Sequence, residues 1–84
     1  MQVNDIERLI EAGFDKAIVK VDSDDNTHFT ALIVAAEFDG MRALARHQLV
    51  YKSLGTLVGN EIHALSIQAF TPSEWAAQAA DKAG

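Results

Sequence analysis

Three histidines, His28, His47 and His63, are the side chains of this sequence suited to metal or proton chemistry near neutral pH. His28 and His63 stand at the starts of two predicted strands, and the spacing between them matches no metal-binding motif. If the two strands lie side by side, both imidazoles reach one edge of the domain and form half of a metal site. The alternative, which the residues alone favour, is two edge histidines hydrogen-bonded to backbone. His47 is expected to pack or cap on a helix.

The composition and the missing motifs exclude several kinds of catalytic and metal site. The sequence has no cysteine, which excludes disulfides, thiol catalysis and a metal cluster held by its own thiolates. No serine lies in a G-x-S-x-G elbow, and there is no glycine-rich phosphate loop. The acidic turn with Asp22, Asp24 and Asp25 lacks the glycine and distal glutamate of an EF-hand, so a solvated turn is expected. We predict that the chain is not an enzyme.

Nucleic-acid binding is an alternative function. The net charge of −5 opposes general attraction to phosphate, but Arg42, Arg46 and Lys52 lie close enough in sequence to form a local basic patch. The order of strands and helices is similar to the KH fold, which clamps single strands with a GxxG loop. Here the corresponding Gly-Met-Arg-Ala at 40–43 lacks the second glycine. Any such binding is expected to be weak.

Length and hydropathy predict one soluble, cytoplasmic domain over residues 1–78, followed by a flexible tail at 79–84. The longest apolar run, at 31–36, is far shorter than the roughly 20 residues that span a bilayer, and the N-terminus has no signal-peptide pattern.

Periodicity and caps predict a small α+β fold, with a strand pair followed by a helical crossover to a third strand. Asn4 and Glu7 have the spacing of a capping box, Gly55 is expected inside the crossover helix, and a break between a turn at 41–45 and the main helix is possible. The predicted elements are a helix at 5–12, strands at 16–22 and 28–36, a helical region at 41–58, a strand at 62–70 and a helix that starts at Pro72, with Thr71 and Glu74 forming its N-terminal cap.

Four motifs carry a resemblance to a known family. They are Phe-Asp-Gly-Met at 38–41, Arg-His-Gln-Leu-Val-Tyr at 46–51, Ile-His-Ala-Leu at 62–65 and Thr-Pro-Ser-Glu-Trp at 71–75. With these motifs the sequence resembles the BolA family, in its bacterial histidine-type branch, over nearly its whole length. The resemblance implies an αββααβα, class II KH-like fold: a three-stranded sheet with helices packed on one face.

The resemblance also implies a function and a site. Family members pair with a monothiol (CGFS-type) glutaredoxin around a glutathione-ligated [2Fe–2S] cluster, and His63 and His28 match the positions of the cluster ligands. Alone, the chain is expected to carry no cofactor and to be a monomer or weak homodimer. Arg46, His47 and Tyr51 match a helix signature that we interpret as structural or partner-facing. Some relatives are linked to stress responses or DNA-binding regulation.

Overall fold

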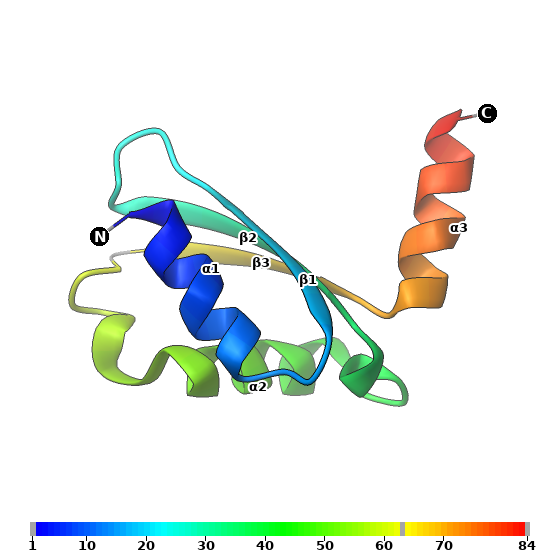
Figure 1. The fold of residues 1–84 in the computed structure, drawn as a ribbon, viewed down its shortest axis with the longest axis horizontal. Coiled ribbons are helices and arrows are strands. Elements are labelled where there is room, and N and C mark those ends of the chain that lie inside the picture. The colour runs from blue at the N-terminus through cyan, green and yellow to red at the C-terminus, as the bar shows by residue number, and fades with distance from the viewer. Residues whose placement is uncertain (1, 63, 84) are drawn as a thin grey trace.

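A sheet of mixed direction, with helices before, between and after its strands, forms the fold (Figure 1). A computed structural model describes residues 2–62 and 64–83. The α+β class predicted from the sequence is confirmed. In chain order the elements are α1 (Val3–Ala12), β1 (Ala17–Asp22), β2 (His28–Ala35), α2 (Ala43–Leu54), β3 (Ala64–Phe70) and α3 (Pro72–Ala83).

The strand order is β1-β2-β3. β1 and β2 form the predicted antiparallel hairpin, and α2 lies in the crossover that makes β3 parallel to β2, with Ala64 opposite His28. β3 starts later than predicted. Ile62 is instead fully buried and forms an isolated bridge with Val58.

The first helix begins earlier than the predicted capping box at Asn4 and Glu7 implies, so that prediction is wrong. The backbone N–H of Gln2 donates to Asp5 Oδ2 at 3.2 Å, nearer the N-terminus. Glu7 acts elsewhere, because its Oε2 accepts from the backbone N–H of Val21 at 2.8 Å. The carboxylate therefore bonds a donor on the outer edge of β1.

The crossover helix also differs from the prediction. α2 is continuous from Ala43, so no break separates 41–45 from a main helix at Arg46. Gly55 does not lie inside it: with φ at +62°, Gly55 ends α2, and its N–H donates to the carbonyl of Tyr51. One-turn 3₁₀ helices flank α2 on either side, at Ala36–Phe38 and Gly55–Leu57.

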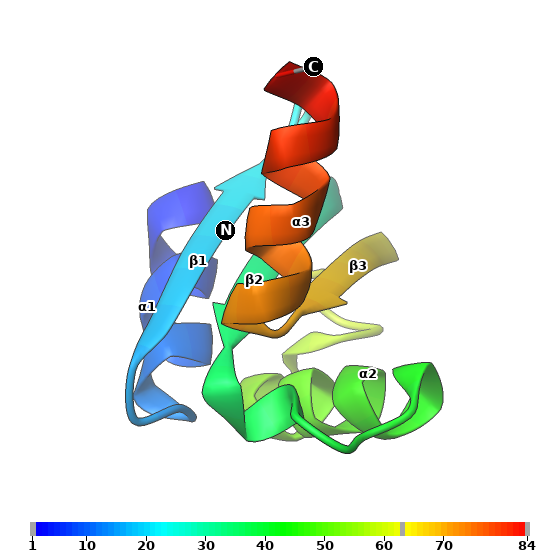
Figure 2. The same cartoon turned by 90° about the vertical axis from the view of Figure 1, so that its right-hand side faces the viewer.

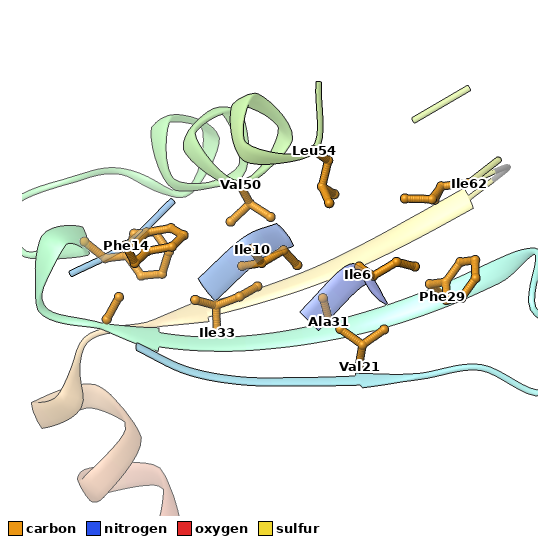
Figure 3. Close-up of a cluster of buried hydrophobic side chains, with 12 residues drawn as sticks. Ile6, Ile10, Phe14, Val21, Phe29, Ala31, Ile33, Val50, Leu54 and Ile62 are labelled. Carbon is orange, nitrogen blue, oxygen red and sulfur yellow. The ribbon is translucent and has the colours of Figure 1, made fainter. Parts of the chain in front are cut away.

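α1 and α2 cover one face of the sheet and enclose the core with it (Figure 3). Each helix contributes an apolar stripe, and the sheet contributes inward-facing side chains at alternate positions. The fully buried large side chains are Phe38, Ile6, Ile10, Ile33, Ile62 and Val50.

The prediction that the helices pack on one face describes α1 and α2, whereas α3 contacts the ends of β2 and β3 and projects beyond the sheet (Figure 2). Trp75 anchors it, with its ring 5.5 Å from that of Phe70. α3 extends to Ala83, past the point where the tail is expected to begin. The mobility expected for residues 79–84 stays a prediction.

Candidate functional site

His28 lies where the β1–β2 turn enters β2, and the carboxylate of Asp25 holds its ring. His28 Nδ1 is 2.8 Å from Asp25 Oδ2 and 3.1 Å from Thr27 Oγ1. The side chain is 69% exposed. The imidazole is thus fixed on one side and open to solvent.

Asp25 also organises the turn itself. Its Oδ1 accepts from the backbone N–H groups of Thr27 at 3.0 Å and His28 at 2.9 Å. Ser23 closes the turn from the other side, because its hydroxyl donates to the carbonyl of His28 at 2.6 Å. Asn26 takes the left-handed conformation at the tip, with φ of +61°. Sequence-local hydrogen bonds therefore set the position of His28.

These hydrogen bonds determine which nitrogen of His28 is free. They hold the pKa of Asp25 well below its usual range, chiefly through the backbone N–H of His28 and next through its side chain. An ionised carboxylate only accepts hydrogen bonds, so Nδ1 of a neutral His28 carries the proton. The lone pair is then on Nε2. A carboxylate behind the opposite ring nitrogen is also the usual support of a metal-binding histidine.

The start of β3 lies beside His28. Ala64 pairs with His28 in the parallel register, and its N–H donates to the carbonyl of Thr27 at 3.3 Å. The two strands therefore lie side by side, which is the condition that the sequence analysis set for a half-site. His63, the other predicted ligand, lies outside the described residues.

An open hollow of about 330 Å³ lies at this end of the sheet. His28 is at its rim with carboxylates on the β1 side and small residues on the β3 side. Its lining includes Asp22, Ser23, Asp24, His28, Thr30, Ala64 and Ser66.

No complete metal centre is present in residues 2–62 and 64–83. Over these residues, no three His, Cys, Asp or Glu side chains come together in a way that would hold a metal ion. His28 has the donor chemistry of one ligand, and a cluster at this position needs the remaining ligands from elsewhere. In the same residues no helix is long and apolar enough to cross a membrane.

Arg46 is a structural residue rather than a free cation. Its side chain is 13% exposed, and its guanidinium donates to the carbonyls of Met41 at 2.9 Å and Ala69 at 3.1 Å. Two further contacts join it to Glu74, at 2.6 and 3.1 Å. The guanidinium also lies 5.8 Å from the ring centre of Phe38. These partners occupy the guanidinium N–H groups with which Arg46 would otherwise bind a phosphate.

The predicted basic patch of Arg42, Arg46 and Lys52 therefore lacks its central member. Arg42 and Lys52 are both exposed, at opposite ends of α2. On the same helix His47 is partly buried, and Tyr51 is 39% exposed.

Two residues that position the site have roles that the sequence analysis missed. Asp25 is expected in a solvated turn, yet it orients His28; the Asp-x-x-His spacing at 25–28 is a signal that could have identified the pair. Glu74 does form the predicted cap with Thr71, through bonds of 2.9 and 3.1 Å. Its second role, holding Arg46, depends on a contact between distant parts of the chain.

Comparisons with known proteins identify the family. Residues 10–74 match the family model described as BolA-like protein. The chain is 39% identical over 77 residues to the acid stress protein IbaG of Escherichia coli K12, covering 90% of each chain. It is 33% identical over 82 residues to the DNA-binding transcriptional regulator BolA of Haemophilus influenzae, covering 87% of this chain and 80% of the relative.

A solved structure agrees with the sequence relatives. The structure of a BolA protein homologue from Coxiella burnetii has a TM-score of 0.81 and 38% identity, and the match covers 90% of this chain and 97% of that one. None of these names is that of an enzyme. The chain belongs to the BolA family, and among its relatives it is IbaG-like.

Proposed function

We propose that this chain is a non-enzymatic, cytoplasmic adaptor that binds a monothiol glutaredoxin and shares a glutathione-ligated [2Fe–2S] cluster with it. The observation that carries the proposal is the contact between His28 and Asp25. Asp25 Oδ2 lies 2.8 Å from Nδ1 of an exposed ring, so in the neutral imidazole Nδ1 carries the proton and the lone pair is on Nε2. This is the form in which imidazole binds a metal.

The second proposed ligand is His63. Its neighbour Ala64 lies opposite His28 in the parallel register, and the parallel β2–β3 pair is what brings the two strand starts together. In this proposal His28 and His63 supply imidazole ligands, while the glutaredoxin and glutathione supply thiolates. The absence of cysteine from the sequence and of a three-ligand group from the described residues both suit a chain that completes a site rather than holding one.

Imidazole ligation has consequences for the cluster. Histidine in place of cysteine on one iron raises the reduction potential of a [2Fe–2S] centre. A neutral imidazole is the competent ligand, so acid weakens this chain's share of the binding. The open rim around His28 leaves room for a partner to approach. Together these properties suit storage, sensing or transfer of a cluster.

The proposal is tested by mixing the chain with cluster-loaded monothiol glutaredoxin and glutathione. Size-exclusion chromatography with iron analysis should show a complex of one copy of each protein that retains the cluster. Asp25→Ala should weaken that complex, whereas Asp24→Ala, in the same turn but without a bond to His28, should not. The proposal is wrong if the two proteins elute separately, with all iron on the glutaredoxin.

A second candidate function is nucleic-acid binding. It is favoured by the relative from Haemophilus influenzae, which is named a DNA-binding transcriptional regulator. Arg42 and Lys52 are exposed on this chain, whereas Arg46 is occupied by Glu74. With a net charge of −5, the exposed Arg42 and Lys52 support only weak, salt-dependent contact with phosphate.

This second function predicts that the double variant Arg42→Gln/Lys52→Gln loses binding to duplex DNA and that added salt weakens the wild-type binding. The matched variant is His28→Gln, which should leave DNA binding unchanged. Binding that is indifferent to the two cations would remove this candidate.

A further inference from the structure

The two edge strands of the sheet, β1 and β3, differ in how far the rest of the chain blocks their outward backbone groups. A free strand edge presents unpaired backbone N–H and C=O groups, and folded proteins usually block it with charges, bulges or covering segments. β1 is blocked: Glu7 bonds the outward N–H of Val21, and Lys20 and Asp22 lie along the strand. β3 has no comparable block along most of its described length.

The sequence of β3, Ala-Leu-Ser-Ile-Gln-Ala-Phe, contains no charged residue and no proline. Ala64 directs its N–H to β2, so the alternate residues Leu65, Ile67 and Ala69 direct their backbone groups away from it. Arg46 bonds the carbonyl of Ala69. In residues 2–62 and 64–83, no hydrogen bond engages the outward groups of Leu65 and Ile67, and no strand lies beyond β3 (Figure 2).

The helix beside this edge, α2, exposes two large hydrophobic side chains. Leu44 is 70% and Tyr51 is 39% exposed, and these two are among the most exposed large hydrophobic side chains. They lie seven positions apart, on one side of α2. Ser53, by contrast, is on the side that faces α1, near Gly13. The Leu44–Tyr51 side of α2 is therefore opposite the side that faces α1, and α2 also contacts β3. We take this side of α2 and the free edge of β3 together as the candidate surface.

We propose that this surface pairs with a second copy of the chain, β3 against β3 in antiparallel orientation, about a twofold axis at Ser66. Leu65 of one copy then pairs with Ile67 of the other, and each such pair exchanges two backbone hydrogen bonds. A twofold axis perpendicular to the sheet puts both α2 helices on the same face. Leu44 and Tyr51 of each copy then face the other copy.

Charge distribution favours a second copy over an unrelated extended peptide. Glu61 is exposed and precedes the start of β3. Arg42 is exposed and precedes α2. Arg46, one turn further along, bonds Ala69 near the end of β3, so Arg42 belongs to that end of the strand. Antiparallel pairing places the start of one β3 beside the end of the other. The proposed pairing therefore brings Glu61 of each copy to the same end of the interface as Arg42 of its partner, and these opposite charges make the surface complementary to itself.

A cysteine cross-link tests the register, because the natural sequence has no cysteine. Residues directly opposite in a non-hydrogen-bonded antiparallel pair have Cα atoms about 4.5 Å apart, within the range that a disulfide spans. Ser66→Cys should therefore form a disulfide dimer on mild oxidation, faster as protein concentration rises. Thr30→Cys is the matched control, since Thr30 is exposed on the same face and is the register partner of Ser66 on β2, away from the edge.

Charge reversal and sedimentation test the same arrangement in the unlinked protein. Sedimentation equilibrium of the wild type should show reversible dimers in the micromolar to millimolar range. Glu61→Arg should weaken them severalfold, and Glu61→Arg/Arg42→Glu should restore them. The proposal is overturned if Ser66→Cys and Thr30→Cys cross-link equally, or if the wild type stays monomeric throughout. These experiments need no glutaredoxin or cluster, so their outcome is independent of the adaptor function.

Discussion

Arg46 on α2 and Glu74 on α3 form a two-point ion pair across 28 positions of sequence, at 2.6 and 3.1 Å. The same guanidinium bonds the carbonyl of Ala69 in β3, and the same carboxylate accepts the N–H of Thr71. One pair of side chains thus joins α2, the end of β3 and the first turn of α3.

Arg46→Met should destabilise the fold and loosen α3, because the carbonyls of Met41 and Ala69 lose their side-chain donor and Glu74 loses its ionic partner. The expected result is a fall of several degrees in Tm and a shift in the emission of Trp75, the sole tryptophan. Arg42→Met, at an exposed position beside the same helix, is the control. Equal effects of the two variants would show that the Arg46 contacts contribute nothing specific.

The same pair predicts a pH dependence. The side chain of Arg46 and the backbone N–H of Thr71 lower the pKa of Glu74 from 4.5 to about 2. A carboxyl with a lowered folded-state pKa stabilises the fold fully above its unfolded pKa and loses that contribution as pH falls through the folded value. Stability from Glu74 should therefore be complete at neutral pH and decline between about pH 4.5 and 2.

Urea unfolding of the wild type and Glu74→Gln measures this contribution at several pH values. The difference in unfolding free energy between the two proteins should be largest at neutral pH and shrink toward pH 2. A difference that stays constant over this range contradicts the assigned pKa.

Gly13 permits the close approach of α1 and α2. A Cβ at this position would lie 2.8 Å from the Cβ of Ser53, while its φ of −86° is ordinary for any residue. Gly13→Ala would gain about 0.4–1 kcal/mol from reduced unfolded-state entropy, but overpacking costs about 1–3 kcal/mol, so net destabilisation is expected. Chemical denaturation measures it. The paired change Ser53→Gly should recover part of the loss, and a stabilised Gly13→Ala protein would contradict the contact.

Asp25→Ala should change the proton distribution of His28. In the neutral form of the wild-type ring, nitrogen-detected NMR should show Nδ1 protonated and Nε2 without a proton, because Asp25 accepts from Nδ1. Without the carboxylate, the Nε2-protonated tautomer should become populated. Asp24→Ala should retain the wild-type pattern, and a wild-type spectrum dominated by protonated Nε2 would refute the geometry.

The sequence predicts the strands and the pairing of β1 with β2 well, since alternation and turn residues are local signals. The cap at Thr71 and Glu74 is predicted for the same reason. The start of α1 is missed because Gln2 is a weak capping type, and Gly55 is misplaced because helical spacing continues past it to Leu57.

The features of the candidate site also divide into those that the sequence predicts and those that only the fold reveals. His28 and the adjacency of β2 and β3 follow from sequence position, whereas the support from Asp25 depends on the detailed fold of the turn. The role of Arg46 is visible only once α3 is placed, because its partner is 28 positions away. The spacing of basic residues along the sequence does not tell whether one of them forms an intramolecular ion pair or contributes to a phosphate-binding patch.

Visible circular dichroism of cluster-loaded monothiol glutaredoxin, titrated with this chain in the presence of glutathione, tests the adaptor function most directly. We expect a saturable new spectrum with the wild type, altered by His63→Ala and more weakly by His28→Ala, and unchanged by the control Lys20→Ala, at an exposed position on β1. If the wild type leaves the spectrum unchanged, or if all three variants reproduce the wild-type spectrum, the two histidines are not cluster ligands.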